Sequence, residues 1–120
     1  MNESTISIVV AVRNGARTLQ RCIDSVRNQA YPHKELIIID GKSTDGTVGI
    51  LSCNANAISW WISEPDIGIY AAWNKALLHV KGEWICFLGA DDYWIASTVL
   101  AQAASRLKEF SLRNVVDEDK

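Results

Sequence analysis

Two adjacent carboxylates, Asp91 and Asp92, follow a short apolar run and are the residues of this chain best suited to do chemistry. The run, Trp84–Leu88, is bulky and uninterrupted, which favours a strand that is buried on both faces. Side-by-side carboxylates repel each other unless solvent, a cation or a hydrogen-bonding ligand compensates their charge. A hard divalent cation with a phosphate attached would do so. A solvated turn or a helix cap is the commoner reason for an isolated Asp-Asp pair, so the rest of the chain must decide.

Polar residues also follow two earlier predicted strands. Arg13 and Asn14 follow the first strand, and Asp40 opens a polar segment, 40–47, after the second. Since the carboxyl ends of parallel strands share one edge of a sheet, the three clusters are expected to converge where open α/β folds bind ligands. Asp40 could accept a hydrogen bond from an imide or a hydroxyl group. A strand-to-helix turn explains the same segment, and Asp45 fits a helix cap better than a ligand contact.

A polar loop, residues 64–68, leads into a predicted helix whose polar side carries Asn74 and Lys75. Lys75 could neutralise a diphosphate as a point charge. A solvated helix face is the commoner position of a single lysine, so both roles stay open. His33 and His79 have no partners at metal-ligand spacing and are expected at the surface.

Several familiar site motifs are absent by spacing. The chain has no Gly-x-Gly-x-x-Gly after its first strand, no P-loop and no Gly-x-Ser-x-Gly elbow. The segment 40–45 is superficially similar to a calcium loop, but Lys42 stands at its third position, where an oxygen ligand is needed. The sequence therefore argues against a dinucleotide fingerprint, a P-loop nucleotidase, an EF-hand and this type of hydrolase.

The composition is that of a single globular domain. The chain has 120 residues, of which 48% are hydrophobic and 22% charged, and its net charge of −2 gives no nucleic-acid footprint. No apolar stretch reaches membrane-span length, and the N-terminus lacks the regions of a signal peptide. Three cysteines fit no metal spacing and are predicted to be reduced core thiols of a cytoplasmic protein: Cys22, Cys53 and Cys86. Five tryptophans in periodic segments are expected to pack in the core: Trp60, Trp61, Trp73, Trp84 and Trp94.

Hydrophobic periodicity predicts alternating strands and helices. Strands are predicted over Ile6–Val12, Glu35–Ile39, Ser59–Ile62 and Trp84–Leu88. Helices are predicted over about 16–29, 44–51, 69–80 and 99–110, with Gly82 as a stop for the third. This βα alternation predicts the α/β class, with a mostly parallel open sheet and helices on both faces. One domain is expected over 1–112, and 113–120 would be a tail or the start of a missing strand.

These clusters, in this order, resemble the N-terminal half of a GT-A glycosyltransferase of family 2, which has a Rossmann-like nucleotide-diphospho-sugar transferase fold. The closest similarity is to the bacterial branch that builds exopolysaccharide and lipopolysaccharide sugars. Four segments carry the resemblance and together span nearly the whole chain: Ser7–Gly15, Ile38–Thr47, Ser63–Lys75 and Gly82–Asp92.

The resemblance implies a nucleotide-sugar site made of Ala11, Val12, Arg13, Asp40, Asn74, Lys75 and Asp91. The residues 11–13 would line the base pocket, largely through their backbone. Asp40 would hydrogen-bond the uracil or another base, and Asp91 would meet the ribose or the sugar. Asp92 would coordinate Mg²⁺ or Mn²⁺ bound to the diphosphate, so that the metal stabilises the departing nucleoside diphosphate as a Lewis acid.

The resemblance also implies the reaction and its partners. A sugar would pass from a UDP-linked or similar donor to a saccharide or lipid-linked acceptor during the synthesis of cell-surface polysaccharide. The full-length protein would be cytoplasmic and peripheral to the inner membrane.

Three departures from the family pattern leave an alternative open. Ala90 stands where the first carboxylate of the Asp-x-Asp motif is expected, so metal binding rests chiefly on Asp92. Ala71 replaces a commonly acidic position, and the catalytic base is expected beyond Lys120. The chain would thus be a donor-binding half truncated after the metal motif. The alternative is a non-catalytic nucleotide-binding or interaction module that self-associates through apolar surface its acceptor half would cover.

Overall fold

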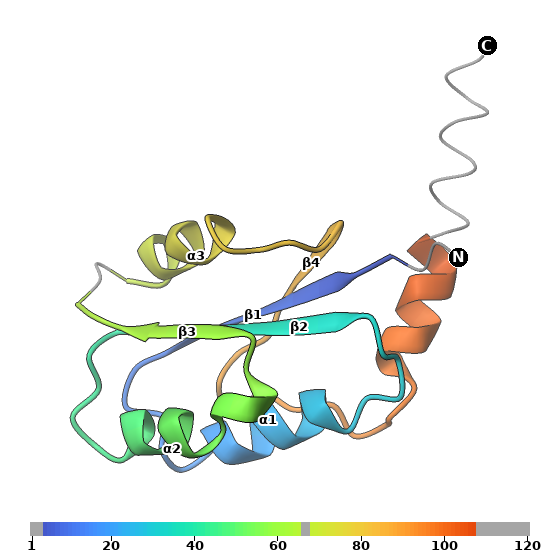
Figure 1. Ribbon diagram of the computed structural model, residues 1–120. Helices are drawn as coiled ribbons and strands as arrows, with labels where there is room; N and C mark the ends of the chain where they lie inside the picture. The colour runs from blue at the N-terminus through green and yellow to red at the C-terminus, as the bar shows by residue number, and fades with distance from the viewer. Residues whose placement is uncertain (1–3, 66–67, 108–120) are drawn as a thin grey trace.

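The computed structural model describes residues 4–65 and 68–107, and its strands and helices alternate along the chain (Figure 1). The elements are β1 (Ile6–Val12), α1 (Leu19–Arg27), β2 (Lys34–Asp40), α2 (Thr47–Cys53), the 3-10 helix η1 (Ala55–Ala57), β3 (Trp60–Ser63), α3 (Ile69–Leu77) and β4 (Trp84–Phe87). A further helix covers 99–107. The predicted βα alternation is therefore confirmed, and the predictions for Phe110 and 113–120 lie outside the described residues.

The described strands form one parallel sheet in the order β3-β2-β1-β4. Helices α1 and α2 lie against one face, and α3 lies against the other (Figure 1). The predicted α/β fold, a parallel open sheet covered on both faces, is confirmed. All four strands consequently end at one edge of the sheet, which is the geometry that the predicted site requires.

Side-chain alternation along β1 divides the core into two layers. Ile8 and Val10 point to the face covered by α1 and α2, whereas Val9 points to the face covered by α3. Helix α1 buries the apolar residues that its 3.6-residue period predicted: Leu19, Cys22, Ile23 and Val26. Because these side chains leave water completely or nearly so, each contributes on the order of 1.5–3 kcal/mol to folding.

The prediction that Trp84–Leu88 is buried on both faces is wrong. Strand β4 pairs with β1, and its side chains alternate between half-buried and exposed, with Ile85 39% and Phe87 44% exposed. The physical reason is its position: within the described residues β4 is an edge strand. An apolar run indicates that a segment can be buried, but it does not show whether another element covers the strand on each side.

The cysteine and tryptophan predictions also need correction. Cys22 is buried and Cys86 is half-buried, but Cys53 is exposed, because the short helix α2 turns Thr47 and Leu51 inward instead. None of the five tryptophans is fully buried. Trp73 lies against Phe87 with ring centroids 4.5 Å apart, and Trp60 stacks on His79 at 3.6 Å. Both histidines are exposed, as predicted.

Helix α3 is shorter and less buried than its periodicity predicted. It ends at Leu77, and only Ala72 and Ala76 are buried within it. Gly82 is not its stop. A Cβ atom on Gly82 would lie 2.7 Å from the Thr5 carbonyl oxygen, so a glycine is needed where the backbone approaches β1 closely.

Candidate functional site at the carboxyl edge of the sheet

The three polar clusters predicted to converge do emerge at one edge of the sheet. Val12 lies opposite Asp40 in the pairing of β1 with β2, and Val9 lies opposite Phe87 in the pairing with β4. Two backbone hydrogen bonds continue this order past the strand ends, from Gly41 to Val12 and from Leu88 to Val9. The segments that begin at Arg13, Gly41 and Gly89 therefore leave the sheet side by side.

Asp40 is the organising residue of the loop after β2. It is 0% exposed, and its carboxylate accepts hydrogen bonds from the Ser43 backbone N–H at 2.9 Å and from the Ser43 hydroxyl at 2.5 Å. The Ser63 hydroxyl at the end of β3 donates a third bond at 2.7 Å. The carboxylate therefore connects the ends of β2 and β3 and fixes the start of the 41–47 loop.

A set of hydrogen bonds between residues 14–16 and 43–47, here called the loop latch, joins the loops after β1 and β2. The Asn14 N–H donates to the Ser43 hydroxyl at 2.7 Å, and the Asn14 side-chain oxygen accepts from the Thr44 N–H at 2.8 Å. The Ala16 N–H donates to the Asp45 carboxylate at 3.1 Å. Asn14 itself has a φ of 51°, a left-handed conformation that asparagine tolerates better than most residues. The latch holds the backbone that follows β1 in one position.

Asp45 lies one residue before the N-cap of α2, which is Gly46, so the prediction that Asp45 caps this helix is wrong in its position. Its carboxylate accepts the Thr47 N–H at 3.0 Å and the Thr47 hydroxyl at 2.5 Å. These bonds favour the charged form, and the bond from the Thr47 side chain contributes most to lowering the pKa of Asp45. Asp45 is therefore a structural member of the loop latch.

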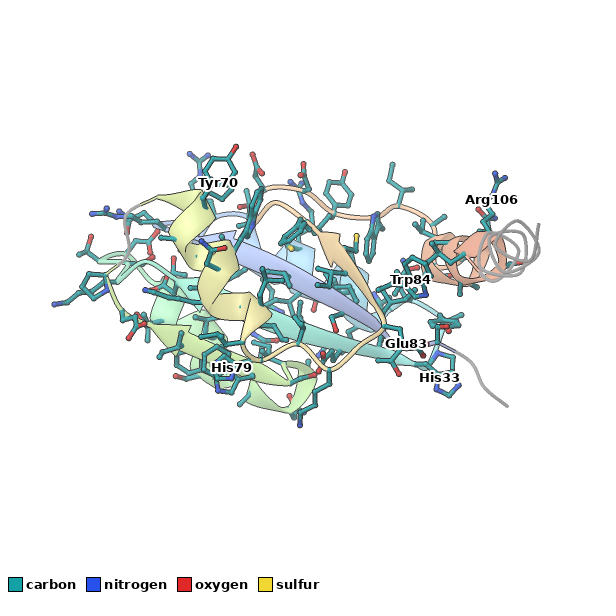
Figure 2. The ribbon with its side chains drawn as sticks, turned by 90° about the horizontal axis from the view of Figure 1, so that it is seen from above. His33, Tyr70, His79, Glu83, Trp84 and Arg106 are labelled. Carbon is teal, nitrogen blue, oxygen red and sulfur yellow. The ribbon has the colours of Figure 1, made fainter. Side chains whose placement is uncertain are left out.

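A pocket of about 190 Å³ opens between the end of β1 and the start of α3, and its lining is Ala11, Val12, Arg13, Gly68, Ile69 and Ala72. A shallower hollow shares four of these residues and extends to Thr18, Gly89, Ala90 and Asp91. The structure thus brings the predicted residues 11–13 and Asp91 to one concave surface. Tyr70 projects outward from the beginning of α3, whereas Glu83 and Trp84 lie at the amino ends of the strands, away from this surface (Figure 2).

The turn after β4 carries the two carboxylates on its outer side. Asp91 and Asp92 are exposed, and the Asp92 N–H closes the turn on the Gly89 carbonyl at 2.9 Å. A Cβ atom on Gly89 would lie 2.7 Å from Asp92 Oδ2 and 3.0 Å from Asp91 Oδ1. Both carboxylates therefore fold back over the Gly89 Cα.

Cys22 is buried beneath this turn, and the negative charges of the turn affect the Cys22 pKa. Burial, with a smaller contribution from the negative charges of Asp92 and Asp91, raises the pKa of the Cys22 thiol to about 12. Cys22 Sγ lies 3.6 Å from the Gly89 carbonyl oxygen. Cys22 is thus a neutral packing residue under the turn and not a nucleophile.

Four predicted residues lie outside the lining of the two pockets, and one of them, Asp92, lies in the turn beside Asp91. Asp40 is buried as described above. Asn74 is exposed on α3, and Lys75 pairs with the Glu64 carboxylate at 3.1 Å and donates to the Pro65 carbonyl at 3.0 Å. The roles predicted for these residues toward a base or a diphosphate stay predictions.

The structure also adds residues that the sequence reasoning missed. Thr18 and Ile69 line the concave surface, and Ser43 and Ser63 hold Asp40. A serine three residues after a strand-end aspartate could have signalled a local Asx-type hydrogen bond. Nothing local indicated Ser63 or Thr18, because both contacts join segments far apart in the chain.

No group of three or more metal-ligating side chains occurs among residues 4–65 and 68–107. The carboxylates that fold over Gly89 nevertheless present hard oxygen donors side by side, which suits a divalent cation that takes its other ligands from water and phosphate. Within the same described part of the chain, no helix is long and apolar enough to cross a membrane.

Comparison with known proteins identifies relatives among the glycosyltransferases. An uncharacterized glycosyltransferase of Mycobacterium tuberculosis is 38% identical over 104 residues, which cover 86% of this chain and 40% of the relative. WfgD of Escherichia coli, named as a UDP-Glc:alpha-D-GlcNAc-diphosphoundecaprenol beta-1,3-glucosyltransferase, is 33% identical over 109 residues, or 90% of this chain and 43% of WfgD. The chain therefore spans less than half the length of these curated relatives.

Solved structures show the same fold. TarS 1–349 of S. aureus, in complex with UDP-GlcNAc, matches 88% of this chain and 31% of its own chain, with a TM-score of 0.80 and 26% identity. The mannosyltransferase PcManGT of Pyrobaculum calidifontis, in complex with GDP-Man and Mn²⁺, matches 84% of this chain and 31% of its own chain, with a TM-score of 0.77 and 28% identity.

The family described as Glycosyl transferase family 2 matches residues 7–117, a range that holds β1, the 40–47 segment and the Asp91–Asp92 turn. The resemblance carried by these segments in the sequence is therefore confirmed. This chain belongs to glycosyl transferase family 2.

Proposed function

We propose that this chain is the donor-binding part of a glycosyltransferase that takes its sugar from a nucleoside-diphosphate sugar, UDP-linked, and passes it to a saccharide or lipid-linked acceptor of cell-surface polysaccharide. The observation that carries the proposal is the concave surface that joins Ala11–Arg13 to Asp91 at the carboxyl edge of the sheet. This edge is where open α/β sheets bind nucleotides.

The nucleoside would lie along the end of β1. Ala11 and Val12 offer backbone groups and small side chains, so a flat base can approach the sheet closely. Arg13 is exposed at the rim of the same pocket, and its guanidinium group is suited to pair with a phosphate. The loop latch keeps this rim in place before the donor arrives, which lowers the entropy lost on binding.

The Asp91–Asp92 turn would hold the metal and the sugar side of the donor. Asp92 would hold Mg²⁺ or Mn²⁺ and Asp91 would meet the ribose or the sugar, since both carboxylates lie on the open side of the turn. When bound, the cation would supply Lewis-acid stabilisation of the departing nucleoside diphosphate. The Mn²⁺ in the PcManGT complex supports this choice of metal.

The acceptor and the cellular site are inferred from the relatives. WfgD is named for a UDP-Glc donor and a diphosphoundecaprenol-linked acceptor, which supports UDP as the nucleotide and a lipid-linked saccharide as the acceptor class. With a lipid-linked acceptor, the full-length protein would act in the cytoplasm and be peripheral to the inner membrane.

Calorimetric titration of UDP with and without Mn²⁺ tests the proposal. We expect Mn²⁺ to tighten UDP binding at least ten-fold, about 1.4 kcal/mol. Asp92→Ala should remove this gain and leave metal-free binding unchanged. Glu83→Ala is the matched control, because Glu83 is an exposed carboxylate at the opposite edge of the sheet (Figure 2). If wild type binds no nucleoside diphosphate with or without metal, the proposal is wrong.

A further inference from the structure

Helix α1 contacts the segment 89–100 at several points along one of its faces. The Thr18 hydroxyl donates to the Ala90 carbonyl at 2.9 Å, and Cys22 Sγ lies 3.6 Å from the Gly89 carbonyl oxygen. The Arg21 guanidinium lies 4.1 Å from the ring centroid of Tyr93, the residue after Asp92. Positions 18, 21 and 22 are three and four residues apart, so they share a helical face.

A buried side chain just past the end of α1 fixes the far end of the same segment. Gln29 donates to the Ala96 carbonyl at 2.8 Å and accepts from the Leu100 N–H at 3.0 Å. The Ala30 N–H adds a bond to the Ser97 carbonyl at 2.8 Å. The turn that carries Asp91 and Asp92 is therefore exposed at its tip. The residues before and after it are hydrogen-bonded to Thr18 and Gln29, which lie just beyond the two ends of α1.

The Thr18 contact is unusual for the position that Thr18 occupies. Thr18 is the N-cap residue of α1, where a threonine hydroxyl ordinarily accepts a hydrogen bond from the first turn of its own helix and stabilises it. Here the hydroxyl makes no capping bond within α1, whose residues are all described, and donates to a carbonyl 72 positions later instead. The Thr18 hydroxyl therefore bonds the turn after β4 instead of capping α1.

The atom that Thr18 contacts belongs to the backbone directly before Asp91. The Ala90 carbonyl belongs to the peptide group that joins Ala90 to Asp91, so a hydrogen bond to it limits rotation of this peptide plane. The next peptide group, between Asp91 and Asp92, contains the Asp92 N–H, which donates to the Gly89 carbonyl. Both carboxylates are crowded over Gly89, so a rotation at Ala90 would change the spacing of their oxygens.

We propose that Thr18 is a positioning residue that holds the Asp91–Asp92 turn in its metal-binding arrangement through the Ala90 carbonyl. The inference rests on the proposed donor and metal site and adds a residue of its lining whose hydroxyl bonds the turn backbone. Its chemistry is a single hydroxyl donor, which can be removed without a change of shape by Thr18→Val. Thr18→Ser restores the donor.

The first test measures UDP affinity with and without Mn²⁺ for wild type, Thr18→Val and Thr18→Ser. We expect Thr18→Val to reduce the Mn²⁺-dependent gain about ten-fold and to reduce metal-free UDP affinity by clearly less than that. Thr18→Ser should recover the gain to within three-fold. Thr98→Val is the matched control, since Thr98 is an exposed threonine farther along the attached segment.

Two outcomes of this titration would overturn the inference. The first is a Thr18→Val protein that keeps the full Mn²⁺-dependent gain. The second is an equal loss of metal-free and metal-dependent affinity, because that pattern indicates a general structural role. Urea midpoints of the variants show whether each is folded at the temperature of the titration.

Amide hydrogen exchange separates this inference from the proposed function. In the ligand-free protein the Asp92 N–H should exchange at least ten-fold faster in Thr18→Val than in wild type, with wild-type protection in Thr18→Ser. If wild type fails to bind UDP with Mn²⁺, the proposed function is wrong. In that case the exchange rate of the Asp92 N–H still tests whether Thr18 holds the turn. Unchanged exchange of Asp92 in Thr18→Val would show that it does not.

Discussion

Aspartates follow β2 and β4 at the same edge of one sheet, but their surroundings differ completely. Asp40, at the end of β2, is fully buried and accepts three hydrogen bonds from Ser43 and Ser63. Asp91 and Asp92, after β4, are exposed, and Asp91 lines the concave surface. A carboxylate whose oxygens are occupied by the protein orders a loop, whereas one that faces solvent can meet a ligand.

The order of the strands accounts for the difference. Strand β2 lies between β1 and β3, so Ser63 at the end of β3 donates to Asp40, and Ser43 of the loop after β2 supplies the second hydroxyl. Strand β4 has β1 as its neighbour among the described strands, so the turn after it is covered from one side, by α1. Two similar sequence signals thus give an interior aspartate at a central strand and an exterior pair at the edge.

Removal of the buried carboxylate should have the largest effect. We expect Asp40→Ala to lower the free energy of unfolding by about 3 kcal/mol, because it leaves two hydroxyls and one backbone N–H near Asp40 without their acceptor. Asp92→Ala should change the same quantity by less than about 0.5 kcal/mol, as is usual for exposed sites. Urea denaturation followed by tryptophan fluorescence measures both.

The outcome that would break the comparison is an equal loss of stability in both variants. Asp40→Asn refines it, because the amide keeps one oxygen acceptor and should lose less than Asp40→Ala. A fully stable Asp40→Ala protein would mean that Ser43 and Ser63 find other partners, in which case Asp40 would be available to a ligand.

The sequence was sufficient to predict those elements whose hydrophobic pattern agrees with their position in the fold. The β-branched run of β1 and the 3.6-residue spacing of α1 predicted both their existence and their buried faces. The convergence of strand-end clusters also followed from the sequence, because it depends only on parallel topology. The family resemblance of the sequence also indicated that this edge binds a nucleotide-sugar.

Other features depend on which segments become neighbours, and local pattern does not contain that information. The run Trp84–Leu88 is as apolar as the buried part of β2, yet it forms an edge strand. Cys53 sits in an apolar context but faces solvent, since α2 is short. Likewise, Asp40 and Asp91 both come after apolar runs, and their roles differ partly through contacts with distant residues, Ser63 for Asp40 and Thr18 for the turn of Asp91.

The thiol beneath the β4 turn gives a test of intermediate size. Burial and the charges of Asp92 and Asp91 raise the pKa of Cys22 from 9.0 to about 12, so the folded state disfavours the thiolate. The contribution of the neutral thiol to the free energy of unfolding is fully present below pH 9 and is lost as the pH rises toward 12. At pH 10.5 we expect a loss of about 2 kcal/mol in wild type that Cys22→Ala does not show. Urea midpoints at pH 7 and pH 10.5 provide the measurement.

The charge of the exposed pair should be visible in the same experiment. Neutralisation of both carboxylates in Asp91→Asn/Asp92→Asn removes their part of the pKa shift of Cys22, so the alkaline loss of stability should be smaller than in wild type. Glu83→Gln, which neutralises an exposed carboxylate at the opposite edge, should leave it unchanged. An alkaline profile that does not respond to the double substitution would show that the turn does not lie over Cys22 in solution.

Asp45 offers the smallest effect and the sharpest form of the comparison, because it is exposed like Asp91 but hydrogen-bonded like Asp40. The bonds from Thr47 and Ala16 lower the pKa of Asp45 below its ordinary value of 3.8. Its contribution to stability is therefore present above that pH and lost as pH falls below it. Wild type should lose a small part of its stability there that Asp45→Asn does not lose, measured as urea midpoints from pH 5 to pH 2. If Asp45→Asn keeps the wild-type acid profile, the hydrogen bonds to Asp45 do not contribute to stability, and burial alone explains why Asp40 orders its loop.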